Sequence, residues 1–71
     1  MDYVNVRSST IDAVAYDASS NTLGIRFKND TEYHYFNVPA NIHAALMAAS
    51  SIGTLFHALI RNGGYRYEQV R

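Results

Sequence analysis

The spacing of apolar residues changes once along the chain, near Pro39, and this change limits the folds that are possible. Before Pro39, apolar residues tend to alternate with polar ones, as in strands with one buried face. After Pro39 they recur every three or four residues, as on one side of a helix. We therefore expect an α+β fold in which an antiparallel sheet is followed by helices packed on one of its faces.

Three strands are predicted before Pro39. The clearest alternates Leu23, Ile25 and Phe27 with small or charged residues, as expected of a half-buried strand. Polar, turn-prone residues separate the strands. Pro39 ends the last one because proline has no N–H for a sheet, and its fixed φ suits the first residue of a helix. The expected ranges are 11–17, 23–28 and 32–38, which form a three-stranded meander.

Two helices and a short strand are predicted after the meander. The first helix covers 39–49. The second has the most regular helical spacing in the chain and ends at Gly63 and Gly64, which accept a left-handed backbone at no steric cost. The tail 65–71 alternates aromatic and polar residues and predicts a short C-terminal edge strand. The apolar stripes are Ile42, Ala45, Leu46 and Ala49 in the first helix and Ile52, Leu55, Phe56, Leu59 and Ile60 in the second.

Composition limits the classes of protein that remain. The length suits one small domain, 1–71, and 48% of the residues are hydrophobic against 17% charged, so the chain is expected to fold. The absence of cysteine excludes thiolate catalysis and zinc–thiolate sites. Six Lys and Arg balance six Asp and Glu, which argues against a strongly electrostatic nucleic-acid or membrane binder. No signal peptide or membrane span is recognisable, so we expect a cytoplasmic protein with no membrane partner.

The order and spacing of short motifs along the chain resemble one family. The motifs are Ser8-Ser9 followed by Ile11, Tyr16-Asp17, Leu23-x-Ile25-x-Phe27, Tyr33-His34-Tyr35-Phe36, Val38-Pro39, Ala49-x-Ser51-x-Gly53, Phe56, Ile60 and Tyr65-x-Tyr67. Together they resemble the KTSC domain, a short bacterial and phage module that occurs alone or at the C-terminus of some lysyl-tRNA synthetases. Asp30 stands where such domains commonly carry glycine, and His57 where asparagine is common. The family has no established reaction, and its fusion to a tRNA-charging enzyme implies RNA binding by analogy.

The length of the loop at residues 29–30 decides where the central tyrosines point. With a two-residue loop, Tyr33 and Tyr35 share a face with Arg26 and Lys28 and lie away from the apolar side of the sheet. Such a basic and aromatic face is similar to the sheets on which single-stranded nucleic acids stack. On those surfaces each stacked base contributes about 1–3 kcal/mol.

A three-residue loop has the opposite consequence. If Asp30 adopts a left-handed conformation and Phe27 pairs with Thr31, the register moves by one residue. Tyr33 and Tyr35 then join the core, with their hydroxyl groups at its rim. The sequence leaves both registers open.

We therefore expect a small non-catalytic binding module for RNA or another single-stranded nucleic acid. The alternative is a protein-interaction or self-associating module that uses an uncovered, tyrosine-rich sheet face or edge. Neither function requires a cofactor. The residues expected to contact nucleic acid are Arg26, Lys28, Tyr33, Tyr35, Tyr65, Arg66 and Tyr67.

Neither a catalytic site nor a metal site is predicted. His34, His43 and His57 fall on different elements, and no cysteine or closely spaced carboxylate completes a tetrahedral shell around any of them. Asp12 and Asp17 point to opposite sides of one strand, so they do not form an acid–base pair. No serine lies in a glycine-flanked nucleophile turn.

Polar residues at two element boundaries are predicted to be structural. Ser8 and Ser9 are expected to form the turn into the first strand, with their hydroxyl groups bonded to nearby backbone. Ser50 or Ser51 is expected to cap the second helix, and Gly53 to permit a close approach between the helices. A lone Ser-x-Gly lacks the lysine and the further glycines of a phosphate-binding loop.

Overall fold

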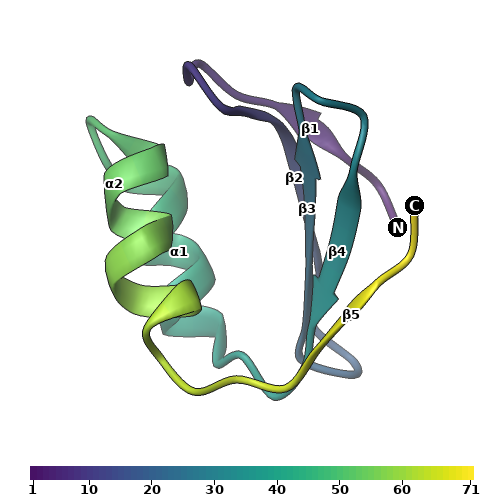
Figure 1. The fold of residues 1–71 in the computed structure, drawn as a ribbon. Coiled ribbons are helices and arrows are strands. Elements are labelled where there is room, and N and C mark those ends of the chain that lie inside the picture. Colours follow the sequence, from purple (N-terminus) through teal and green to yellow (C-terminus); the bar gives the residue numbers. More distant parts are fainter.

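Five antiparallel strands form one sheet, and the helical segments cover one of its faces (Figure 1). This computed structural model describes residues 1–71. The strands lie side by side in chain order. They are β1 (Val4–Asn5), β2 (Ile11–Asp17), β3 (Thr22–Phe27), β4 (Glu32–Tyr35) and β5 (Tyr67–Gln69). The helical segments are α1 (Ala40–Ala48), α2 (Ile52–Phe56) and η1 (His57–Arg61), a π-helical continuation of α2.

The predicted α+β architecture is confirmed, and the sheet is larger than predicted. β2, β3 and β4 form the expected meander, and the expected C-terminal strand, β5, pairs with β4. β1, which pairs with β2 at the other edge, was not predicted. A strand of two residues is too short to show a period of two, so no pattern could reveal it.

β4 is shorter than the predicted strand 32–38. Asn37 has a φ of 60°, in the left-handed region, and this interrupts the extended backbone. Val38 then turns into the core, where its carbonyl accepts a 2.6 Å hydrogen bond from the Tyr16 hydroxyl. Pro39 is the residue before α1 rather than its first helical residue.

Phe27 pairs with Thr31 at the turn between β3 and β4, so the loop that they enclose has three residues, 28–30, and it decides the direction of the central tyrosines. The N–H of Phe27 donates to the carbonyl of Thr31 at 2.8 Å, and Asp30 has a φ of 70°. In the resulting register Leu23 lies opposite Tyr35. The tyrosines of β4 therefore lie on the helix side of the sheet, and the two-residue loop, which would place them beside Arg26 and Lys28, is wrong.

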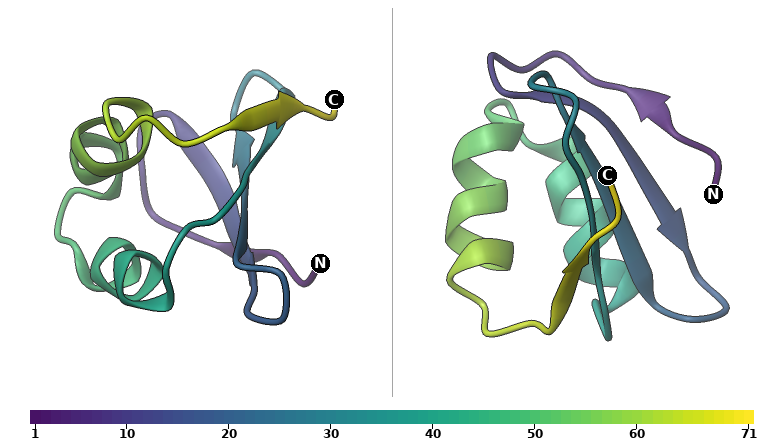
Figure 2. Two further views of the ribbon diagram at one scale, coloured as in Figure 1. Left: turned by 90° about the horizontal axis from the view of Figure 1, so that it is seen from below. Right: turned by 45° about the vertical axis from the view of Figure 1, so that its right-hand side comes forward.

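The hydrophobic core lies between this face of the sheet and the helices, which lie side by side against it (Figure 2). The register of β2 against β3 shifts at Asp12, as at a β-bulge, so that both Ile11 and Val14 are buried. The largest fully buried side chains are Ile11, Leu23, Ile25, Leu46, Ile60, Val14 and Val38.

The second helix ends as predicted, and its start differs in detail. Gly64, just beyond it, has a φ of 77°, the left-handed conformation expected of a helix-ending glycine. The N–H of Asn62 donates to the carbonyl of His57 at 3.2 Å, which is the spacing of a π turn. Ser51 precedes α2 as expected, but its hydroxyl lies 2.9 Å from the Thr54 hydroxyl instead of bonding to the backbone.

Gly53 makes a close approach, but to a loop. A Cβ atom at this position would lie 3.3 Å from the Thr10 Oγ1 and 3.4 Å from the Ser8 Oγ. The predicted helix–helix contact at Gly53 is therefore wrong, because its neighbour is the segment between β1 and β2. None of the helices is long and apolar enough to cross a bilayer.

Candidate functional site

A groove of about 330 Å³ lies between the β4–β5 side of the sheet and the end of η1. We call it the tyrosine groove. Rings from β3, β4, β5 and the segment before β5 line it, and one arginine from η1 lies among them. The lining residues that define it are Phe27, Tyr33, Tyr35, Arg61, Tyr65 and Tyr67.

The groove has a buried floor and an exposed wall. Tyr35 is only 6% exposed, whereas Tyr67, directly opposite it on β5, is 61% exposed. Their ring centroids are 5.6 Å apart, and that of Tyr33 lies 6.3 Å from Tyr35 and 6.0 Å from Tyr67. The Tyr33 hydroxyl donates to the Gln69 Oε1 at 3.2 Å. The rings thus support one another and leave Tyr67 open to a flat ligand.

Arg61 brings a positive charge to the groove. Burial raises the pKa of the Tyr35 hydroxyl, and the nearby guanidinium of Arg61 opposes this effect. The Arg61 side chain has neither an ion-pair nor a hydrogen-bond partner in the chain. An unpaired cation beside exposed rings can receive an anionic group of a ligand.

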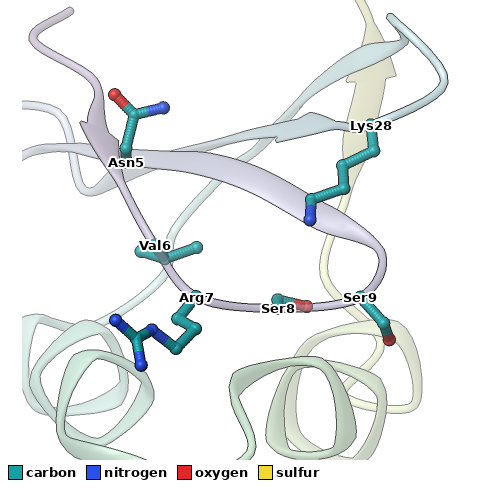
Figure 3. Close-up of a pocket in the computed structure, with 6 residues that line it drawn as sticks. All are labelled: Asn5, Val6, Arg7, Ser8, Ser9 and Lys28. Atoms are coloured by element: carbon teal, nitrogen blue, oxygen red, sulfur yellow. The ribbon is translucent and has the colours of Figure 1, made fainter.

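A second hollow, of about 580 Å³, lies where β3 ends beside the segment between β1 and β2. We call it the basic hollow. In Figure 3 the Lys28 side chain crosses β2 toward this segment, and the Arg7 side chain lies on the opposite side of the segment. The Ser8 Oγ accepts hydrogen bonds from the N–H groups of Thr10 and Ile11, at 3.2 and 3.1 Å, as predicted. The same prediction is wrong for Ser9, whose hydroxyl makes no bond to the backbone. The lining residues are Asn5, Val6, Arg7, Ser8, Ser9 and Lys28.

A shallow depression of about 490 Å³ joins the two features. It shares Phe27 and Arg61 with the tyrosine groove, and Ser9 and Lys28 with the basic hollow. None of the three concavities is lined by an aspartate or glutamate. One continuous surface therefore leads from exposed rings to unpaired cations.

The opposite face of the sheet, which we call the outer face, has its charges paired. The Glu32 carboxylate accepts hydrogen bonds from the Tyr3 hydroxyl at 2.7 Å and from the Arg26 Nε at 3.2 Å. The Arg26 guanidinium also lies 4.1 Å from the centre of the Tyr3 ring, and His34 Nε2 lies 3.7 Å from Glu32. The register places Arg26 here, so it does not share a face with the tyrosines as one prediction required.

The pKa values on the outer face reflect this pairing. The hydrogen bond from Tyr3, followed by the bond and charge of Arg26, holds the pKa of Glu32 below its ordinary value despite partial burial. Burial and the Glu32 carboxylate raise the pKa of the Tyr3 hydroxyl. Glu32 is therefore ionised and Tyr3 neutral near pH 7.

The other residues predicted to contact nucleic acid lie in three places. Tyr33, Tyr35, Tyr65 and Tyr67 come together in the groove, and Lys28 lies in the basic hollow. Arg66 lies apart, with its guanidinium 4.9 Å from the centre of the Phe36 ring.

Arg71 donates from its Nε to the Asp30 carbonyl at 3.1 Å. Of the six cations, the three without a partner, Arg7, Lys28 and Arg61, are those that line the concave surface.

Two site residues, Arg7 and Arg61, were not predicted. Arg61 reads as a solvated helix end, because nothing local shows that the helix ends beside β5. Arg7 precedes the Ser8-Ser9 motif, which was its only signal.

The histidines lie in separate environments. His43 stacks on Tyr16, with ring centroids 4.6 Å apart, and burial lowers its pKa. His34 neighbours Glu32 on the outer face, and His57 is exposed. No group of three or more potential ligands could hold a metal ion.

The sequence of this chain matches one known protein family. The sequence profile of the KTSC domain matches residues 7–67. The chain belongs to the KTSC family. The resemblance drawn from the motifs is therefore confirmed, and the matched range includes the whole tyrosine groove and all of the basic hollow except Asn5 and Val6.

Relatives of this KTSC domain occur in proteins of different length. It is 37% identical over 62 residues to a lysine–tRNA ligase from Nostoc sp., a match that covers 87% of this chain and 11% of the ligase. An uncharacterised protein from Stutzerimonas stutzeri is 30% identical over 99% of both chains. The crystal structure of a KTSC domain protein from Yersinia pestis superposes with a TM-score of 0.92 at 30% identity, covering 99% of this chain and 97% of that one.

Proposed function

We propose that this KTSC domain binds single-stranded RNA without catalysis. Bases would stack on the open rings of the tyrosine groove, and phosphates would approach Arg61 and the basic hollow. The observation that carries the proposal is the continuity of an aromatic and a cationic surface with no acidic lining residue. Proteins that hold single strands combine these two surfaces, because bases offer flat π faces and the backbone offers negative charge.

The tyrosine groove presents a ring that is already oriented for stacking on a base. Tyr67 is largely exposed and rests against Tyr33 and Tyr35, so its ring is already oriented before a base arrives. Little side-chain entropy is then lost on binding. Two relatives are lysine–tRNA ligases, enzymes named for an RNA substrate, and this supports RNA as the nucleic acid.

A fluorescence-polarisation titration with a labelled single-stranded RNA of mixed sequence tests the proposal. Tyr67→Ala should weaken binding about tenfold, since one stacked base contributes about 1–3 kcal/mol. Absence of binding at low salt, or an unchanged dissociation constant for the variant, would contradict it. A DNA strand of the same sequence shows whether the 2′-hydroxyl is recognised.

Two arginines provide a matched control for the phosphate contact. Arg61→Ala should reduce the slope of log affinity against log salt by about 0.7, the value for one phosphate contact to a single strand. Arg66→Ala removes the same side chain from the ring of Phe36, outside the groove, and should leave the slope unchanged. Equal effects of the two substitutions would count against a defined phosphate contact at Arg61.

A second candidate function is self-association through the edge of β5. The three residues of this strand are exposed, and β5 is the last strand of the sheet, so one side of its backbone is free to pair with another strand. Light scattering over a range of concentrations tests this. A mass that rises with concentration and falls back in Tyr67→Lys would favour it, and a constant monomer mass would exclude self-association.

A further inference from the structure

The basic hollow has features that the binding of bases does not require. Both of its cations, Arg7 and Lys28, lack an ion-pair partner in the chain. No acidic side chain lines the hollow. The N–H of Lys28 donates to the carbonyl of Thr10 at 2.9 Å, so the backbone at Lys28 is tied to the segment that carries the two serines.

This segment also presents hydrogen-bond donors. The backbone N–H groups of Ser8 and Ser9 have no acceptor within the chain. The Ser8 Oγ accepts two backbone N–H groups, which leaves its own hydrogen free to donate, and the Ser9 hydroxyl has no partner. The residues that line the hollow therefore supply two cations, two hydroxyl groups and two free N–H groups, all of which are donors suited to an anion.

We propose that the basic hollow binds a phosphate monoester, the terminal phosphate of a strand whose bases occupy the tyrosine groove. The strand rests on the proposed function, whereas the phosphate site rests on Arg7, Ser8, Ser9 and Lys28 alone. A monoester carries a charge of about −1.5 to −2 near pH 7, more than an internal diester, and so matches two cations better. The hollow shares no lining residue with the tyrosine groove and is joined to it through the depression, so the end of a strand whose bases occupy the groove would reach the hollow.

The first test compares RNA strands of one sequence that differ only at their ends. Strands with a 5′-phosphate, a 3′-phosphate or hydroxyl ends are titrated against the unmodified protein. One phosphorylated end should bind about tenfold more tightly than hydroxyl ends, as expected for new charge-assisted hydrogen bonds. Equal affinity for all three strands would overturn the inference.

Substitutions then separate the two sites. Arg7→Ala combined with Lys28→Ala should abolish the advantage of the phosphorylated end, whereas Tyr67→Ala should weaken all strands and preserve the ratio. Both cations are exposed, so their removal should leave the fold intact, as circular dichroism would verify. Retention of the advantage in the double variant would overturn the inference.

A second measurement does not depend on RNA. Inorganic phosphate is added to ¹⁵N-labelled protein, with sodium chloride at equal ionic strength as the control. Saturable shifts of the Ser8, Ser9 and Lys28 amide signals, absent in the double variant, support the phosphate site even if no RNA binds, in which case the proposed function fails alone. The absence of specific shifts overturns the site, and preference for free phosphate over phosphorylated strands overturns the assignment to a strand end.

Discussion

The outer face and the concave surface on the other side differ in how their charges are satisfied. On the outer face, Glu32 bonds to Tyr3 and Arg26 and neighbours His34, so the negative charge of Glu32 and the positive charge of Arg26 are paired within the chain. On the concave surface, Arg61 and Lys28 both line the shallow depression, and neither has an acidic partner. Charge that is paired internally stabilises the fold, and charge left unpaired beside exposed rings is available to a ligand.

A chain of zero net charge can present a basic surface when its acidic residues lie elsewhere. The six acidic residues are absent from the lining of the tyrosine groove, the basic hollow and the depression between them. Net charge therefore does not exclude an anionic partner here, because such a partner responds to the local field. The zero net charge argued against a nucleic-acid partner, but that argument is weaker because three cations lie together on the concave surface.

The largest expected effect concerns the two parts of the tyrosine groove. Tyr35→Ala should lower the free energy of unfolding by about 3 kcal/mol, because it removes a buried ring that packs on Phe56 in the core. Tyr67→Ala should lower it by less than about 1 kcal/mol, because that ring is exposed. Urea denaturation measures both. Equal losses would mean that the groove has no distinct floor and wall.

The next effect concerns the carboxylate of the outer face. Glu32→Gln should cost about 1–2 kcal/mol at pH 7, since hydrogen bonds to a charged group are lost or weakened. The pKa of Glu32 is lowered in the folded state, so its contribution is present above the ordinary value and is lost as pH falls through the lower, folded value. The difference between the two proteins should therefore disappear in acid. A difference that is constant with pH would show that the charge is not responsible.

A smaller effect is expected at Gly24, beneath the side chain of Tyr3. A Cβ atom there would lie 2.5 Å from the Tyr3 Oη and 3.2 Å from the Met1 Sδ, so Gly24→Ala should displace both and cost about 1 kcal/mol. In a Tyr3→Ala background the same substitution should cost much less, which a double-mutant cycle measured by urea denaturation would show. Independent, additive costs would contradict the contact between Gly24 and Tyr3.

The smallest effect compares two arginines, one paired and one not. Arg26→Ala should cost about 0.5–1 kcal/mol, because it removes an ion pair to Glu32 and a contact with the Tyr3 ring. Arg61→Ala should change stability by less than about 0.5 kcal/mol, because no side chain pairs with it. Thermal and urea denaturation at low salt measure both. A larger cost for Arg61 would show that it supports the fold.

Much of the fold was predictable because its signals are local. The alternation of Leu23, Ile25 and Phe27 and the helical spacing that ends at Ile60 each reflect one buried face, and these elements are present as expected. β1 was not predictable, because two residues carry no period. The early end of β4 depends on the left-handed backbone at Asn37, which an asparagine permits but does not require.

The candidate site was only partly predictable. The sequence identified the tyrosines as site residues, but it did not decide on which face of the sheet they lie. It assigned Arg26 to the site, although Glu32 and Tyr3 engage this residue on the outer face. Arg61 reaches the tyrosines only because the chain returns from η1 to pair β5 with β4.

The sequence by itself determined the family, the order of the elements after β1 and the residues that could stack or carry charge, because each depends on residue type and short-range spacing. The tertiary structure alone decided which side of the sheet the tyrosines take and which cations remain unpaired. The physical reason is that sheet register has a period of two, so one residue in the loop at Asp30 exchanges the faces of β4. Pairing across strands distant in sequence, such as β4 with β5, then sets the neighbours of every charge.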